Sequence, residues 1–258
     1  MSRIREAFYN KKAFIPFITC GDPDIETTEK IVLAAAENGA DLIELGIPFS
    51  DPTAEGPVIM EADSRALASG TTTDDVFALT ARLREKLAIP LVYMTYANVV
   101  FSYGTERFAA KAAAAGADGI ILPDVPFEEK GEFEAAFAAH GIDLISMIAP
   151  TSKERIGMIA REARGFLYIV SSLGVTGTRS AINTDIGAMT ALIREHTDIP
   201  CAVGFGIQSP DQARAMASLS DGAIVGSAII KIMAKYGRDA APYVGGYVRE
   251  MAEAAHRA

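Results

Sequence analysis

The sequence predicts a single-domain (β/α)8 barrel, or TIM barrel, with an extra helix at its N-terminus. Eight short β-rich runs alternate with stretches of helical periodicity, an order typical of parallel strands joined by crossover helices. Eight such units in 258 residues match a closed barrel in size, and no Pro/Gly/Ser-rich linker or charge block divides residues 1–258. A doubly wound open sheet is the alternative. The predicted strands are residues 14–19, 41–47, 89–96, 119–125, 143–148, 166–172, 201–206 and 222–228.

Helix signals lie where this alternation needs them. The first dozen residues are amphipathic around Ile4, Phe8 and Phe14 and predict a helix that covers the N-terminal mouth of the barrel. Residues 151–154 and 209–212 have the pattern of a capping box, with Thr or Ser followed three positions later by Glu or Gln. These signals predict that helices begin after the fifth and seventh strands.

A short sequence pattern that recurs before predicted strands also supports repeated helix-to-strand turns. Gly39 and Gly116 each open a Gly-Ala-Asp step before a predicted strand, and Gly141 opens a related Gly-Ile-Asp step. Because this is a common way to end a helix, it is poor evidence for gene duplication.

Composition excludes several classes of function. A net charge of -9 argues against nonspecific nucleic-acid binding, which needs clustered Lys and Arg. Cys20 and Cys201 lie far apart on apolar segments, so we expect buried free thiols and neither a metal site nor a disulfide framework. The chain has no apolar signal core and no apolar run of the roughly 20 residues that cross a bilayer. We therefore expect a cytoplasmic protein.

Two carboxylates bracket the most informative loop, in the segment LIELGIPFSDPTAEGP at residues 42–57. Glu44 lies in an apolar strand, where an ionisable group is costly unless a polar cavity or partner receives it. Glu55 follows in a loop at the C-terminal end of that strand, the end that carries the active site in a (β/α)8 barrel. We expect both to converge there with Tyr96 and Asp124. The alternative is that Glu44 forms a structural ion pair and Glu55 is solvated.

Glycines after the last three predicted strands indicate a phosphate site. They occur at residues 174–177, at residues 204–206 and at Gly226, where Gly226-Ser227 opens the last helix. Glycine lets the backbone approach an anion, and the N–H groups and dipole of a helix N-terminus favour negative charge. The alternative is that these glycines serve tight turns only.

Acid-base chemistry falls to carboxylates in this prediction. His140 and His196 lie at predicted helix C-termini and His256 in the tail, where helix dipoles or exposure explain them. Tyr96, Tyr168 or Asp124 could assist. No spacing of His, Cys or acidic residues predicts a metal site, and Arg179 is interpreted as a loop anchor.

Several segments together resemble the α subunits of tryptophan synthase over essentially the whole chain. LIELGIPFSDPTAEGP is the most specific, and the others follow in the order of that family. They are FIPFITCGDP, YANVVFSYG, LPDVPFEE, VSSLGVTGTR, GFGI and GSAI. The resemblance implies a (β/α)8 barrel that cleaves indole-3-glycerol phosphate to indole and glyceraldehyde 3-phosphate, without a cofactor.

The resemblance also implies roles for individual residues. Glu44 would be the main acid-base group, with a pKa raised towards neutrality, and Glu55 would bond the indole N–H. Phe17, Tyr96, Tyr168 and Thr176 would line or latch the indole site, and Gly177, Gly206, Gly226 and Ser227 would hold the phosphate.

The chain departs from the family at Glu55, where the family has aspartate. A carboxylate displaced by about 1 Å can cost ~100-fold in rate. The family partner is the pyridoxal-phosphate-dependent β subunit, in an α2β2 heterotetramer, and its contact would involve Thr53 to Pro57 and Asn98 to Tyr103. Two alternatives stay open: another phosphate-binding barrel enzyme of the isomerase or aldolase class, and a catalytically weak barrel that activates the β subunit.

Overall fold

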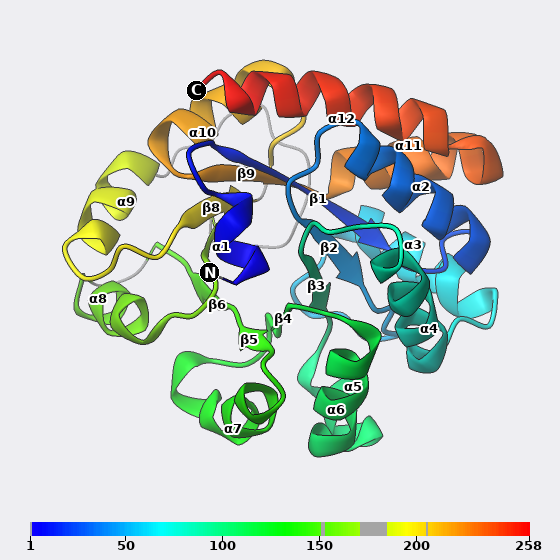
Figure 1. Ribbon diagram of the computed structural model, residues 1–258, viewed down its shortest axis with the longest axis horizontal. Coiled ribbons are helices and arrows are strands. Elements are labelled where there is room, and N and C mark those ends of the chain that lie inside the picture. The colour runs from blue at the N-terminus through cyan, green and yellow to red at the C-terminus, as the bar shows by residue number, and fades with distance from the viewer. Residues whose placement is uncertain (1, 151–152, 171–184, 205) are drawn as a thin grey trace.

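The computed structural model describes residues 2–150, 153–170, 185–204 and 206–258 and has the predicted barrel architecture. Parallel strands form the central wall and helices surround it (Figure 1). The strands are β1 Ala13–Thr19, β2 Ile43–Gly46, β3 Leu91–Met94, β4 Gly119–Ile121, β5 Asp143–Leu144, β6 Ser146–Ile148, β7 Leu167–Val170, β8 Cys201–Gly204 and β9 Gly222–Val225. Each falls within or at the edge of a predicted run.

The helices alternate with these strands along the chain. They are α1 Arg3–Ala7, α2 Ile25–Glu37, α3 Pro57–Ala68, α4 Thr73–Arg84, α5 Ala97–Tyr103, α6 Thr105–Ala115, α7 Gly131–Ala139, α8 Lys153–Glu162, α9 Ile186–Arg194, α10 Pro210–Leu219, α11 Ser227–Tyr236 and α12 Ala241–His256, with short 3-10 turns η1 Phe127–Glu129 and η2 Gly237–Asp239. Of the described helices, none is long and apolar enough to span a membrane.

The nine strands of the described residues correspond to eight barrel positions, because the fifth is divided. The sheet runs β5-β4-β3-β2-β1-β9-β8-β7-β6, so its two ends are neighbours in sequence. β5 and the Ile145 N–H pair with β4, whereas β6 pairs with β7. The chain thus changes partner at Ile145, and the alternative of an open doubly wound sheet is wrong.

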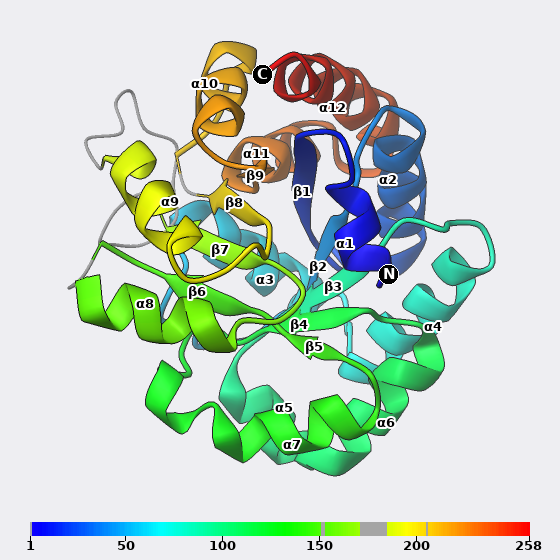
Figure 2. The ribbon, with the colours of Figure 1, turned by 60° about the vertical axis from the view of Figure 1, so that its left-hand side comes forward.

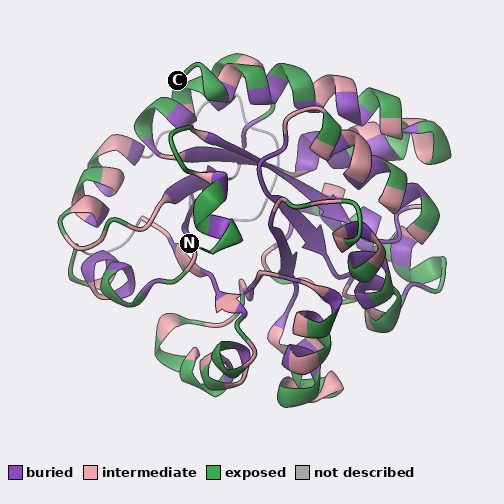
Figure 3. Cartoon of the chain, in the orientation of Figure 1, coloured by how far each residue is buried: buried purple, intermediate pink, exposed green. Residues whose placement is uncertain are grey.

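Burial explains why these runs form strands. All residues of β1, β2, β3 and β7 are buried, which matches apolar runs that face the barrel interior on one side and helices on the other. The helices turn their buried faces towards the strands and their exposed faces outwards (Figure 3). A capping box at Ser209 and Gln212 begins α10, as predicted, while Thr151 of the other predicted box lies outside the described residues.

Two of the Gly-X-Asp steps, those that begin at Gly39 and Gly116, have a structural cause. The carboxylates of Asp41 and Asp118 accept backbone N–H groups of the preceding strand of the sheet, from Phe14 at 2.8 Å and from Leu91 at 2.9 Å. Asp221, which begins the turn into β9, accepts the Cys201 N–H at 2.8 Å in the same way. Each aspartate therefore closes the N-terminal end of the barrel by satisfying a donor at the start of a strand.

The N-terminal helix is shorter than predicted. Only Arg3–Ala7 is helical, the chain passes through a left-handed residue at Asn10, and Phe14 belongs to β1. Its placement at the N-terminal mouth is confirmed, because Phe8 contacts Phe166, which precedes β7, with ring centroids 5.7 Å apart. Figure 2 shows α1 across the same end of the strands. It therefore covers the end of the barrel opposite the predicted site.

Candidate active site

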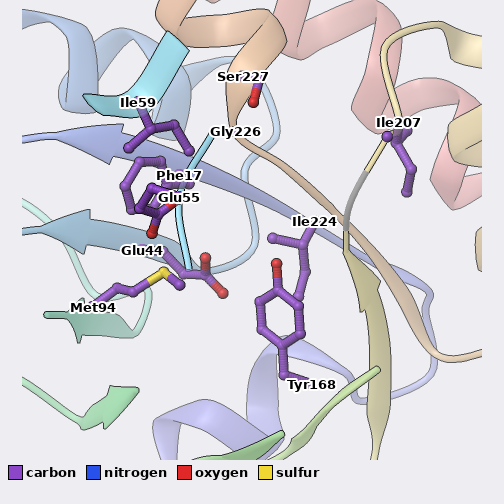
Figure 4. Close-up of a pocket in the computed structure, with 11 residues that line it drawn as sticks. Phe17, Glu44, Glu55, Ile59, Met94, Tyr168, Ile207, Ile224, Gly226 and Ser227 are labelled. Carbon is purple, nitrogen blue, oxygen red and sulfur yellow. The ribbon is translucent and has the colours of Figure 1, made fainter. Parts of the chain in front are cut away.

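A small cavity lies at the C-terminal ends of the strands, where the carboxylates were predicted to meet. Both Glu44 and Glu55 line it, together with residues from the first, third, sixth, seventh and eighth barrel positions and from α3 (Figure 4). Its described lining is Phe17, Glu44, Glu55, Ile59, Met94, Tyr168, Gly206, Ile207, Ile224, Gly226 and Ser227. The free space is about 30 Å³, against roughly 300–1,000 Å³ for typical ligand sites, so a bicyclic ring requires side chains to move.

Glu44 projects into this cavity from β2. Its side chain is buried, with 1% of the residue exposed, and its Oε1 has no hydrogen-bond partner among the described residues. Burial, reinforced by the negative charge of Glu55, raises the pKa of Glu44 to about 8. No described Lys or Arg pairs with it, so the ion-pair alternative is wrong for the described residues. A protonated carboxyl aimed into a cavity is suited to general acid catalysis.

Glu55 is also buried, because the loop that carries it folds back over the strands. Only 5% of the residue is exposed, so the alternative of a solvated loop residue is wrong. The Ala54 N–H donates to the Tyr96 hydroxyl at 3.1 Å, and the Phe49 ring stacks on Tyr96 with centroids 5.3 Å apart. Tyr96 thus holds both limbs of the loop that presents Glu55.

Two rings occupy space that glycines leave open. A methyl group on Gly46 would come within 2.6 Å of the Phe17 ring, and one on Gly204 would overlap the Tyr168 hydroxyl. Burial and the charges of both cavity carboxylates raise the pKa of Tyr168 well above its usual value, so it stays a neutral phenol. Figure 4 shows the Tyr168 hydroxyl and the Glu44 carboxylate pointing into the same cavity.

The predicted phosphate residues are brought together only in part. Gly226 and Ser227 begin α11, and Gly206, in a left-handed conformation at φ 81°, lines the same cavity. The N–H groups of the first turn of α11 have no intrahelical acceptor, as at any helix N-terminus. This helix is not the last, because η2 and α12 follow it. Thr176, Gly177 and Arg179 lie outside the described residues.

Two predicted residues serve other purposes in the structure. Tyr96 is not among the described lining residues and instead supports the loop of Glu55. Asp124 accepts the Ala97 N–H at 3.1 Å and so caps the start of α5. Met94, Ile207 and Ile224 line the cavity without having been predicted.

Asp63 is the ionisable residue beside the site that sequence reasoning missed. It lies on α3 and is 6% exposed. Burial, then the charge of Glu55, raise its pKa to about 8. A signal was present, because Ile59, Asp63 and Ala66 share the buried stripe of this helix.

The histidines and both cysteines are not among the described residues that line the cavity. His140 pairs with Glu106, and His256, the last residue of α12, pairs with Asp41 at 2.7 Å and is not simply exposed. Both thiols are buried and free, as predicted. Burial raises the pKa of Cys201 to about 12, which makes this thiol inert.

Comparisons with known proteins agree with the site. Residues 4–256 match the family model described as "Tryptophan synthase alpha chain". The chain is 45% identical over 251 residues to the protein of that name from Lacticaseibacillus casei, with 97% of this chain and 94% of the relative covered. It is 48% identical over 255 residues to the one from Lactiplantibacillus plantarum, covering 98% and 96%.

Solved structures with the same fold come from the same family. The tryptophan synthase subunit alpha of Legionella pneumophila superposes with a TM-score of 0.90 at 36% identity and covers 100% of both chains. A chain from Mycobacterium tuberculosis tryptophan synthase gives a TM-score of 0.90 at 34% identity, with 99% and 98% covered. Together with the carboxylate cavity at the end of its (β/α)8 barrel, these matches establish that the chain belongs to the tryptophan synthase alpha chain family.

Proposed function

We propose that Glu44 is the acid-base residue with which this chain cleaves indole-3-glycerol phosphate to indole and glyceraldehyde 3-phosphate. The observation that carries the proposal is a buried carboxyl, with an oxygen that has no partner among the described residues, aimed into a cavity that also contains Glu55. An apolar setting with a second carboxylate nearby is how proteins keep one carboxyl protonated near neutral pH.

The chemistry needs one group that can give a proton and take another. Glu44 donates its proton to indole C3, which makes an indoleninium cation. The bond between C3 and the side chain then breaks, its electron pair returns to the ring, and the adjacent hydroxyl becomes the aldehyde. The proton of that hydroxyl passes to the Glu44 carboxylate, so the reaction ends with Glu44 protonated again and needs no net proton.

The second carboxylate stabilises the charge that develops. In this proposal the Glu55 carboxylate accepts a hydrogen bond from the indole N–H, which becomes more acidic in the cation. The Phe17 side chain contacts the indole ring. The Tyr168 hydroxyl donates a hydrogen bond close to the two carboxylates. Gly206, Gly226 and Ser227, with Thr176 and Gly177 assigned from the family resemblance, close the site and hold the phosphate at the start of α11.

We also propose a tryptophan synthase β subunit as partner in an α2β2 assembly, with pyridoxal phosphate on that subunit and a cytoplasmic location. Contacts at Thr53 to Pro57 and along α5 would reach the site, because the N-cap residue of α5, Tyr96, bonds the loop at Ala54. Variants of Asn98 or Pro126 are expected to lose β-dependent activation. Unchanged activation in both would contradict this placement.

Indole release from indole-3-glycerol phosphate by the purified chain, with and without a β subunit, tests the proposal. Glu44→Gln serves as the blank, since it keeps the shape of the side chain and removes its acid-base function. Turnover above this blank is the expected result. No turnover even with the β subunit bound, in a chain that still activates it, would favour a regulatory barrel.

Glu55→Asp separates the effect of side-chain length from the effect of charge. The loop around Tyr96 seats the longer side chain in the cavity, so shortening it withdraws the carboxylate by about 1 Å and is expected to lower kcat by up to ~100-fold. Equal or higher activity of Glu55→Asp would show that this loop is not adapted to glutamate.

A further inference from the structure

We propose that the ion pair between Asp22 and Arg65 positions Glu55: it fixes α3, the helix that begins just after Glu55, against the turn that follows β1. Both residues act through Glu55, so their role rests on the function proposed for that carboxylate. Neither of them is among the described residues that line the cavity. Neither the family resemblance nor the comparisons assign them a role.

The pair between Asp22 and Arg65 is bidentate. The Nε and Nη2 atoms of Arg65 each donate to one carboxylate oxygen of Asp22, both at 2.8 Å. The Asp22 side chain is 2% exposed, whereas the Arg65 side chain is 37% exposed, so the carboxylate is shielded from water and the guanidinium compensates its charge. A planar guanidinium that is bound through two nitrogen atoms fixes direction as well as distance. This pair is therefore suited to hold α3 in one orientation.

The C-terminal end of α3 contacts the same turn at two further points. Ser69, the C-cap residue of α3, has its hydroxyl 3.3 Å from the Gly21 carbonyl oxygen. Thr71 fills the space beside Gly21, because a methyl group on this glycine would come within 2.0 Å of the Thr71 hydroxyl oxygen. The turn follows the strand that carries Phe17. α3 is therefore joined to β1 by polar contacts and by close packing.

The other end of α3 reaches the site. The helix contacts β1 and α11, and these two elements and its own first turn supply Phe17, Ser227 and Ile59 to the cavity lining. Figure 4 shows Phe17, Glu55 and Ile59 grouped at one side of the cavity. One residue separates Glu55 from the first helical residue, Pro57. The direction of α3 therefore decides where the Glu55 carboxylate lies.

The length of the helix sets how strongly the ion pair acts on Glu55. Arg65 lies about 12 Å along the helix axis from Pro57, at about 1.5 Å per residue. A tilt of α3 by about 5° at Arg65 moves its first turn by about 1 Å. A displacement of about 1 Å in a catalytic group can cost ~100-fold in rate. The hydrogen bond between Ala54 and Tyr96 holds the residue before Glu55, so Glu55 lies between two fixed points.

The kinetic test measures kcat and KM for indole release in Arg65→Lys and Asp22→Asn, with Tm measured for each variant. Lysine keeps the positive charge beside Asp22 and loses the bidentate geometry. Asp22→Asn weakens the same contact from the other side. Arg82→Lys is the matched control, because the Arg82 side chain is 42% exposed and its Nε donates to Glu29 at 2.8 Å, which joins α4 to α2.

We expect Arg65→Lys and Asp22→Asn to lower kcat by about tenfold or more and to keep KM within about fivefold of the wild type. The loss falls on kcat because Glu55 stabilises charge that develops in the transition state. Arg82→Lys should keep kcat within about twofold of the wild type. A role in stability alone would lower Tm and leave kcat of the folded chain unchanged, and that result would overturn the proposal.

A double-mutant cycle with Glu55→Gln shows whether the pair acts through this carboxylate. In a chain that already carries Glu55→Gln, Arg65→Lys should change kcat by no more than about twofold, because the group that it positions is gone. An equal loss of kcat in both backgrounds would overturn the proposal even in an active enzyme.

Indole binding keeps the two proposals distinguishable, because it needs no turnover. The chain contains no tryptophan, so the fluorescence of added indole can be excited without a protein background. We expect Arg65→Lys to weaken indole binding by about fivefold and to have no effect in the Glu55→Gln background. If the wild type is inactive, the lyase proposal is refuted and this cycle decides the role of the pair: equal indole affinities of the wild type and Arg65→Lys overturn it. An inactive wild type that binds no indole overturns both proposals.

Discussion

Glu44→Gln is expected to stabilise the folded chain while it abolishes turnover. The wild-type carboxyl is 1% exposed, and its Oε1 has no described hydrogen-bond partner, so the folded state resists its ionisation. Burial raises the pKa of Glu44 from an ordinary 4.5 to about 8. Glutamine has a similar shape and does not ionise, so it removes this cost.

The sign and size follow from proton binding. The unfolded chain releases the Glu44 proton near pH 4.5, whereas the folded chain keeps it until about pH 8. Between these values the folded state binds more protons, so its free energy of unfolding falls as pH rises, by about 1.4 kcal/mol per pH unit. The advantage of Glu44→Gln over the wild type should therefore grow by about 3 kcal/mol between pH 5 and pH 7.

Thermal unfolding at pH 5, 6, 7 and 8 measures this difference. A change of about 3 kcal/mol corresponds to about 5–10 °C in Tm for a chain of this size. Glu61→Gln is the control, because an exposed carboxylate on α3 should give a difference that does not change with pH. A Tm difference between Glu44→Gln and the wild type that stays constant from pH 5 to pH 8 would refute the reasoning.

Gly204→Ala should lower kcat/KM by about 10–100-fold, because its methyl group overlaps the Tyr168 hydroxyl and displaces that ring. Gly246→Ala, in open space on α12, should leave activity unchanged and raise the free energy of unfolding by up to about 1 kcal/mol. Asp118→Ala should cost about 3 kcal/mol of stability in denaturant unfolding, because two arginines and the N–H at the start of β3 lose their acceptor. Asp143→Ala should cost less than 1 kcal/mol, because burial raises the pKa of that carboxyl and its ionised form is not favoured; an equal loss in both aspartate variants would contradict the role given to Asp118.

The barrel was predictable from sequence because periodicity reports burial directly. Each predicted run that is buried on both faces formed a strand, and the Gly-X-Asp steps marked the turns that Asp41 and Asp118 close. The division of the fifth strand at Ile145 was not predictable, since its change of partner depends on the closure of the whole sheet. The prediction made the N-terminal helix too long, because the position of Phe14 fits the apolar stripe of a helix and a buried strand equally well.

The candidate site was predictable only where sequence position fixes spatial position. Glu44 and Glu55 follow from barrel topology, because the C-terminal ends of parallel strands converge. Barrel topology also predicts that Tyr96 lies at this end. It does not predict that Tyr96 bonds Ala54 and does not line the cavity, because that contact depends on how the loop folds back. Asp63 was missed because a single acidic residue on a helix is typical of a surface position, and its burial depends on how α3 packs in the folded chain.

By itself, the sequence determined which segments form strands and helices, at which end of the barrel the chemistry lies, and the family to which the chain belongs. These properties depend on local periodicity and on motifs that are contiguous in the chain. Only the tertiary structure decided that Glu55 is buried, that Glu44 lacks a described ion-pair partner, and that Asp63 on α3 is buried as well. The physical reason is that the protonation of a carboxyl depends on solvent exclusion and on charges brought near it from distant segments, which no local pattern encodes.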